Sequence, residues 1–202
     1  MDAKSTTDVA FSPSVKTIQA RKGSRAGYAK LEARGGWDER VTPELAAYVA
    51  ERDSFYLGTA SADGQPYIQH RGGTRGFLRV LDEHTLAFAD YRGNRQYISQ
   101  GNLAENDRAF LFLMDYAKRR RLKIWGRARV VEDDPALLAS LAEGTGDAKP
   151  EQAIVFTIEA WDRNCPQHIP QLLPADEVRD VVAELRARVA ALEEENRALR
   201  GV

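Results

Sequence analysis

Short apolar runs separated by turn residues dominate the middle of the chain. The runs are rich in β-branched and aromatic residues, which favour strands. They predict strands at residues 55–60, 66–71, 77–81, 85–90, 108–114, 122–131 and 154–160. The Asp63-Gly64 pair is the strongest short signal for a hairpin turn. Antiparallel strands at hairpin spacing favour a mainly β fold with helices (α+β), built as a closed or partly closed barrel, over a parallel doubly wound sheet.

Helical periodicity interrupts and flanks these strands. Thr42 is a suitable N-cap for a helix that ends near residue 52, and Pro43 suits its first position. Two further helices are expected over residues 95–104 and 135–141. Residues 1–13 are polar and are expected to be frayed.

The first forty residues carry only weak helical signals, which Gly23 and Gly27 are expected to interrupt. We therefore expect these residues to form an extension of the barrel and not a part of it. The predicted organisation is an N-terminal extension (1–40), a split-barrel domain (41–170) and a C-terminal helix (171–202).

A heptad repeat marks the C-terminal helix. Valines at a with leucines at d favour two parallel strands, and a lone Asn at a fixes their register. Flanking residues agree, because Arg188 would face Glu193 of a partner and Glu195 would face Arg200. We expect a dimeric coiled coil in a homodimer; the alternative is an amphipathic helix packed on its own domain. The seam residues are Val178, Val182, Leu185, Val189, Leu192, Asn196 and Leu199.

Composition narrows the function classes. Lys and Arg total 29 against 30 for Asp and Glu, so the net charge of -1 argues against bulk binding to nucleic acid or anionic membrane. One cysteine allows no intrachain disulfide, which favours a reducing, cytoplasmic location. No apolar run is long enough to span a membrane, and the N-terminal residues lack the apolar core of a signal peptide.

Two glycine- and arginine-containing segments follow predicted strands. Glycines let backbone amides approach an anion, and Arg presents a planar fork that matches phosphate. The segment 69–76 joins two strands, and the segment 90–96 lies where a strand ends and a helix begins, which is a natural anion site. Taken singly, each is equally well an ordinary turn or helix start. Together they favour a shared phosphate site that is neither a P-loop nor a dinucleotide fingerprint.

The strand over residues 122–131 alternates cationic or polar residues with apolar ones. Such a face suits a planar anionic ligand; the alternative is a solvent-facing strand. Cys165 and His168 would supply too few ligands for zinc, no metal site is expected, and no hydrolytic machinery is visible. The residues on the cationic face are Arg121, Lys123, Trp125, Arg127 and Arg129.

Residues from about 45 to 165 resemble the pyridoxamine 5'-phosphate oxidase-related, FMN-binding split-barrel family. The resemblance implies a six-stranded split barrel that dimerises, with one FMN in each of two interface grooves. It rests on the stretches FYLGTASADGQPYIQHRGG, GFLRVLDEHTLAFADYRGNRQYISQGNLAENDRAFLFLMDY, RRLKIWGRARVVEDD and IVFTIEAWDRNCPQHI.

The resemblance also assigns cofactor-binding residues. One strand lies along the flavin and its ribityl phosphate, a turn closes over the phosphate, a second strand faces the ring, and a tryptophan reaches the flavin of the partner subunit. In that order, the matching residues are Gln69, His70, Arg71, Gly72 and Gly73; Asp90, Tyr91, Asn94 and Arg95; Arg121 and Lys123; and Trp161.

The chain departs from the family after that tryptophan. True pyridoxamine phosphate oxidases carry an Arg-x-His-x-Arg element there, whereas this chain reads Asn-Cys-Pro-Gln-His over residues 164–168. The expected function is therefore an FMN-dependent oxidoreductase that acts on another small substrate as a homodimer. The alternatives are a non-catalytic flavin-binding or redox-sensing protein and a split barrel that binds the deazaflavin F420 or haem. A nucleic-acid module using residues 118–129 is disfavoured by the overall charge.

Overall fold

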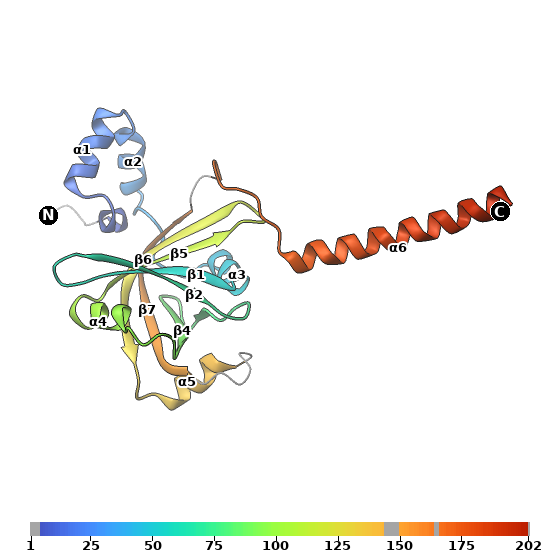
Figure 1. Cartoon of the computed structure of the whole chain (residues 1–202). Helices are drawn as coiled ribbons and strands as arrows, with labels where there is room; N and C mark the ends of the chain where they lie inside the picture. The colour runs from blue at the N-terminus through green and yellow to red at the C-terminus, as the bar shows by residue number, and fades with distance from the viewer. Residues whose placement is uncertain (1–4, 144–149, 164–165, 202) are drawn as a thin grey trace. The chain divides into compact units, whose positions relative to one another are not determined.

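Seven antiparallel strands form one sheet, in the order β2-β1-β5-β6-β7-β4-β3, in the computed structural model of the chain (Figure 1). The structure describes residues 5–143, 150–163 and 166–201, and of residues 176 and 177 only the backbone. The strands are β1 (Ser54–Ala60), β2 (Pro66–Gly72), β3 (Arg79–Val80), β4 (Thr85–Tyr91), β5 (Arg108–Asp115), β6 (Arg120–Val131) and β7 (Pro150–Arg163).

The strands predicted from the apolar pattern are all present, and the α+β split-barrel fold is confirmed. The resemblance implied six strands, and the seventh is the two-residue β3 at the sheet edge. This strand is shorter than predicted because Phe77 and Leu78 turn inward and are buried. In contrast, β7 starts earlier than predicted, since Gln152 continues the pairing with β4 opposite Asp90.

The core lies between the inward faces of the strands. Burial alternates along β5, as expected for a strand with one face on the core. Three fully buried phenylalanines, Phe55, Phe88 and Phe156, anchor this core, and Phe55 meets Phe88 edge-on at 5.1 Å. The helix α3 (Pro43–Ala50) buries Leu45 and Val49 in the same core, with the predicted Thr42 cap bonding the Leu45 amide.

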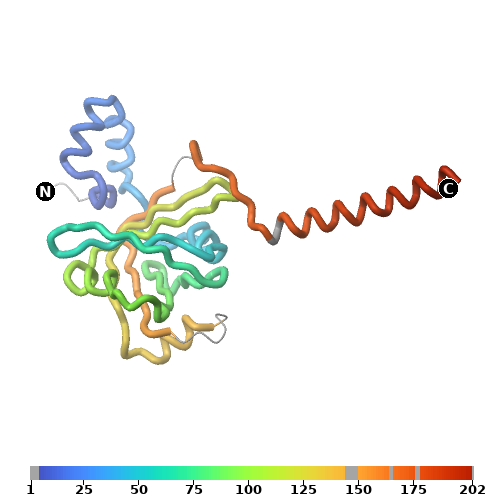
Figure 2. Tube along the Cα trace, in the orientation of Figure 1, coloured from blue at the N-terminus to red at the C-terminus, as the bar shows by residue number. Residues whose placement is uncertain are grey.

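A second, smaller apolar cluster lies on the other side of β4 and β7. The chain runs from β6 into the helix α5 (Pro135–Ala142), as the trace in Figure 2 shows. Leu141 of this helix is buried against Ala87, Ala153 and Val155. Asp134 caps this helix by accepting from the Leu137 amide. β4 and β7 are therefore covered on both faces, which explains their nearly continuous apolar sequences.

The helix α4 (Ile98–Glu105) lies beside β1 and β2 (Figure 1). It begins three residues later than the predicted start at residue 95. Arg95 and Tyr97 have left-handed backbones, with φ of 61° and 54°, so the chain makes a tight turn before the helix forms. This turn, rather than a helix end alone, shapes the β4–α4 connection.

The N-terminal residues are better ordered than their composition suggests. Ser5 forms a capping box with Asp8 on the short helix η1 (Thr6–Val9), and Thr7 is fully buried. The frayed segment predicted for residues 1–13 is therefore wrong from residue 5 onward, while residues 1–4 lie outside the described range. The helices α1 (Pro13–Arg21) and α2 (Arg25–Glu32) follow.

Glycine ends one of these helices and not the other. Gly23 has a left-handed φ of 80° and separates α1 from α2, as expected. Gly27 lies inside α2 and does not interrupt it. The helix tolerates this glycine because an ionic cluster holds it to its neighbours.

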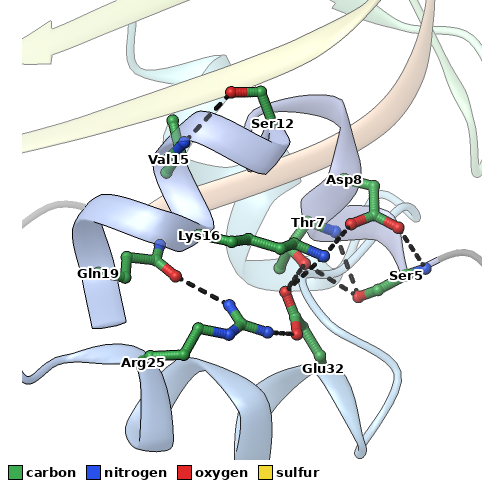
Figure 3. Close-up of polar contacts among 9 residues, drawn as sticks. All are labelled: Ser5, Thr7, Asp8, Ser12, Val15, Lys16, Gln19, Arg25 and Glu32. Atoms are coloured by element: carbon green, nitrogen blue, oxygen red, sulfur yellow. Dashed lines mark hydrogen bonds and ion pairs between the residues drawn. The ribbon is translucent and has the colours of Figure 1, made fainter. Parts of the chain in front are cut away.

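That cluster joins η1, α1 and α2 (Figure 3). The Lys16 ammonium lies 2.6 Å from Asp8 and 3.3 Å from Glu32, and the Arg25 guanidinium bonds both Glu32 and Gln19. The hydrogen bond from Arg25 is the larger cause, and the one from Lys16 the smaller, that holds the pKa of Glu32 below its ordinary range. The segment is thus held by this ionic cluster together with the edge-on contacts of Phe11 with Tyr28 and Trp37.

The chain divides into two compact units. The first comprises residues 1–114 and 121–165, and the second comprises residues 115–120 and 166–202. In the second unit, Leu172 and Gln171 bond the carbonyls of Tyr116 and Ala117, and the helix α6 (Ala175–Arg200) follows. None of the helices within the described ranges is both long and apolar enough to cross a membrane.

Gly126 is required where β6 passes β7. The register of the two strands shifts at this residue, and a Cβ on it would lie 2.0 Å from the Thr157 carbonyl oxygen. We predict that Gly126→Ala lowers the free energy of unfolding by about 3 kcal/mol. Gly101→Ala is the matched control, since its Cβ would meet nothing within 4 Å on α4 and should stabilise by about 0.5–1 kcal/mol. Urea denaturation distinguishes the two; equal effects would contradict the packing argument.

The ionic cluster predicts an acid-sensitive N-terminal segment. Because the folded pKa of Glu32 is lowered, its carboxylate stabilises the segment above the ordinary carboxyl pKa, and this contribution is lost as the pH falls through the lowered value. The protection factors of the α1 and α2 amides against hydrogen exchange, which correct for the slower intrinsic exchange in acid, should therefore fall at acidic pH. In Glu32→Gln, exchange should already be fast at neutral pH and the acid step should shrink. An unchanged acid step in that variant would show that another group is responsible.

Candidate functional site

A polar pocket of about 310 Å³ opens where β2, the β4–α4 connection and the start of β7 meet. The backbone turn before α4 forms one wall, and residues on the core-side face of β2 form the other. The pocket is lined by Tyr67, Gln69, Arg71, Asp90, Tyr91, Gly93, Asn94, Arg95, Gln96, Tyr97, Ile98, Ser99, Gln100, Glu151 and Gln152.

Strand alternation decides which β2 residues enter the pocket. Tyr67, Gln69 and Arg71 share one face of β2 and line the pocket, and two of them, Gln69 and Arg71, are predicted cofactor-binding residues. His70 lies on the other face, where its ring meets Tyr56 edge-on at 5.6 Å. The pocket therefore brings together six of the predicted residues: Gln69, Arg71, Asp90, Tyr91, Asn94 and Arg95.

A buried hydrogen-bond chain crosses the floor of the pocket. Arg71 Nη1 donates to Asp90 at 2.6 Å, and Gln152 Nε2 donates to the other Asp90 oxygen at 2.9 Å. The side chains of Arg71 and Asp90 are each only 14% exposed. Gln152 faces Asp90 because the two residues are paired in the β4–β7 register. These hydrogen bonds hold the Arg71 side chain in one orientation.

Two buried donors in this pocket lack partners among the described residues. They are Nε of Arg71 and the hydroxyl of Tyr91. A buried donor without a partner costs about 1–3 kcal/mol. Such groups are rare in folded proteins and are expected where a ligand completes the hydrogen bonding.

The turn before α4 adds further donors. Tyr97 occupies the N-cap position without a side-chain cap, so the first turn of α4 keeps amides for another acceptor. Ser99 Oγ donates to Gln69 Oε1 at 2.9 Å and ties the start of α4 to β2. The arrangement suits an anionic group placed between the helix start and Arg71.

Charge in the pocket is balanced rather than positive. Arg71 and Arg95 are opposed by Asp90 and Glu151, which also line it. A hydrogen bond with Tyr97, and then the charge of Glu151, raise the pKa of Arg95. Tyr97 in turn donates to Glu151 at 3.0 Å. An anion would therefore be held by directed donors and not by net charge.

The two predicted glycines lie just beyond the pocket lining. Gly72 is paired with Ser54 at the end of β2. The Gly73 amide donates to the Asp53 carbonyl at 2.9 Å, and a Cβ on Gly73 would lie 2.7 Å from the ring of Phe77. The Phe77 ring packs so close to the backbone of residue 73 that only glycine fits there.

The outward face of β6 carries the predicted cationic side chains, and two of them, Lys123 and Arg127, form ion pairs. The Lys123 ammonium lies 2.7 Å from the Asp162 carboxylate. Hydrogen bonds from Arg127 to Asp107, the larger cause, and to Glu159 raise the pKa of Arg127. Nε of Arg121 is buried and has no partner in the described part of the chain. On this face, and among the described residues, Arg121 is the side chain that keeps a buried donor for a ligand.

An aromatic stack that sequence reasoning missed covers this face. Trp37 stacks on Trp125 with ring centres 4.8 Å apart, and Lys123 lies over both rings. Trp37 comes from the linker after α2, where no periodic pattern marks it. Trp161 is buried, and its indole donates to the Arg40 carbonyl at 2.9 Å, so within one chain it belongs to the core.

Several pocket residues were not predicted. Tyr67 was recoverable from the alternation of β2, because it lies two residues before Gln69. Glu151 and Gln152 were not, because their place depends on strand register. Cys165 lies outside the described residues. No cluster of three or more potential metal-ligating side chains occurs in the ranges that the structure describes.

Comparison with known proteins places the chain in a family. Residues 41–165 match the family model described as Pyridoxamine 5'-phosphate oxidase. No curated protein sequence matches the chain.

The alignments with HupZ show a shared fold at low identity. HupZ of Group A Streptococcus aligns with a TM-score of 0.51 and 16% identity, covering 66% of this chain and 99% of HupZ. A HupZ variant aligns with a TM-score of 0.50 and 16% identity over 61% of this chain and 99% of its own. A Clostridium acetobutylicum protein of the pyridoxinephosphate oxidase family has a TM-score of 0.46 and 19% identity, over 67% and 94% of the two chains. Since the family match spans most of the chain, this protein belongs to the pyridoxamine 5'-phosphate oxidase family.

Proposed function

We propose that the chain is an FMN-binding oxidoreductase that acts on a small substrate as a homodimer. One observation carries the proposal. The buried side-chain donors that lack partners in the described residues are Arg71 Nε, Tyr91 OH and Arg121 Nε. All three belong to residues that the family resemblance assigns to the cofactor. Donors left unused inside a folded protein support a bound group with several acceptor oxygens.

The phosphate of FMN fits the pocket between β2 and α4. Arg71, already fixed by Asp90, would offer Nε, and Tyr91 would offer its hydroxyl. Arg95 and the amides at the start of α4 would complete the set. Family membership supports this placement, and the balanced charge of the pocket favours a ligand held at fixed positions.

The redox chemistry would come from the flavin, whereas the protein supplies binding, orientation and charge. Arg121 would place a positive charge near the ring and favour its reduced, anionic form. Lys123, which is already paired with Asp162, would contribute less. His70, Gly72, Gly73 and Trp161 stay predictions, because they line no part of the pocket.

A second copy of the chain would complete the site. The face of β2 opposite the pocket exposes Ile68, and Tyr56 beside it on β1 is partly exposed. Phe110 and Phe112 continue this apolar face on β5. Apolar residues on the outward face of a sheet support a protein contact there. Because β2 contributes to both the pocket and this face, a partner here would adjoin the cofactor.

The first test is the identity of the bound group. The purified protein should show flavin absorbance and release FMN on denaturation, as identified by mass spectrometry. Release of haem or F420 instead would replace FMN with that ligand. A colourless protein that does not bind added FMN would overturn the proposal.

Removal of Arg71 should weaken FMN binding. We predict that Arg71→Ala raises the dissociation constant by about 10- to 100-fold, the range expected for charge-assisted bonds to one group. Because this change also leaves Asp90 without its cation, thermal unfolding first establishes that the variant is folded at the temperature of the titration. Arg108→Ala is the control, since Arg108 is exposed on β5 and lies outside the pocket. Fluorescence quenching of FMN on titration measures both. Equal losses in the two variants would show that general charge, and not the pocket, binds the flavin.

Tyr91→Phe should have opposite effects on ligand affinity and on stability. The hydroxyl has no partner in the described residues, so its removal should leave the cofactor-free protein as stable or up to about 1 kcal/mol more stable. The same change should weaken FMN binding by about tenfold. Thermal unfolding with and without FMN measures both effects. A variant that is destabilised without FMN would show that the hydroxyl serves the fold.

A further inference from the structure

The helix α6 presents an apolar seam along its length. Its 26 residues form one continuous helix. The valines and leucines that recur in steps of four and three are all exposed, from 38% at Val182 to 81% at Leu199. A stripe of this spacing, narrower than the apolar face of a helix that covers a globular core, is typical of a coiled-coil seam.

We propose that α6 pairs with α6 of a second copy of this chain as a parallel, in-register, two-stranded coiled coil. The seam has Val182, Val189 and Asn196 at a, with Val178, Leu185, Leu192 and Leu199 at d. β-Branched residues at a with leucine at d favour two strands over three or four. The occupant of the seam is thus another copy of the same helix.

Asn196 decides the orientation. In a parallel, in-register pair it faces Asn196 of the partner subunit, and the two amides hydrogen-bond to each other. In an antiparallel pair, a positions face d positions, so Asn196 would face an apolar side chain, Val178 or Leu185 of the other helix, and leave a buried amide unpaired. An unpaired buried amide is strongly unfavourable. The single polar residue in the seam therefore selects the parallel arrangement.

Charges beside the seam agree with this register. In a parallel pair, each g residue faces the e residue five positions later on the other helix. Arg188 would then face Glu193 of the partner subunit, and Glu195 would face Arg200 of the partner subunit. A pair shifted by one heptad would place Arg188 against Arg200. Opposite charges at both sites support the in-register pairing.

A membrane surface is a poorer occupant for the seam. Helices that lie on membranes carry Trp or Phe on the apolar face and many Lys or Arg on the polar face. The helix α6 contains no aromatic residue, and acidic residues outnumber basic ones along it. Anionic lipid would repel such a helix.

Disulfide trapping in the full-length chain tests the pairing and its direction. In a Cys165→Ser background, Val182→Cys places the single thiol at an a position near the start of the seam. A parallel pair brings the two Cβ atoms within disulfide range, whereas an antiparallel pair separates them by about 15–20 Å along the helix, far beyond that range. Asp180→Cys is the matched control, because it lies two residues away on the outer face of the helix.

We expect Val182→Cys to form disulfide-linked dimers at least about tenfold faster than Asp180→Cys under mild oxidation. Adding Leu185→Asp should reduce the rate to that of the control. Equal rates from the two cysteines, or no cross-link from Val182→Cys, would overturn the proposal. Flavin absorbance of the same samples reports on the FMN site separately, so failure of one proposal is distinguished from failure of the other.

Discussion

Side chains, and not backbone pairing, join the two strands that flank the pocket. The strands β2 and β4 lie near opposite ends of the sheet order and are not paired with each other. Arg71 and Asp90 bridge them at 2.6 Å, and Gln152 extends the bridge into β7. Both charged groups are largely buried, so removal of either would leave an uncompensated charge, which is strongly destabilising. The pocket exists because these strands meet at side-chain distance.

The same bridge prepares the pocket for a ligand. Asp90 consumes one arm of the Arg71 guanidinium and fixes the plane of the group, while Nε stays unused. A fixed donor loses less conformational entropy on binding than a free side chain does. This fixed Arg71 donor also explains how a pocket whose positive and negative charges balance can favour an anion. In this pocket, the positions of the hydrogen-bond donors matter more than the net charge.

The N-terminal extension is built by different physics from the barrel. Its helices bury few large apolar side chains, and the Lys16, Glu32 and Arg25 cluster holds them together. One aromatic contact links the extension to the sheet, through Trp37 on Trp125. Flat stacking of two indoles beside Lys123 buries a large area, so the outward face of β6 is partly covered. This contact explains why the alternating pattern of β6 does not produce a solvent-facing strand throughout.

The local pattern of the sequence determined the elements. The strands, most helix positions and the heptad of α6 follow from periodicity and turn chemistry, which act over a few residues. The glycine and arginine segments at 69–76 and 90–96 likewise pointed to the pocket, because Gln69, Arg71, Asp90 and Arg95 all line it. Errors fell where local preference was overruled, as at residues 5–13, which the capping box and a buried Thr7 hold in place.

Only the tertiary structure decided how those elements meet. The sequence could not show that Gln152 would face Asp90, because register depends on pairing between distant strands. Nor could it show that Arg71, Tyr91 and Arg121 would keep unused donors after folding. Hydrogen bonding and burial are properties of the packed chain. The sequence by itself therefore determined the strands, the helices and the residue types available for an anion site, and packing decided which of them face it.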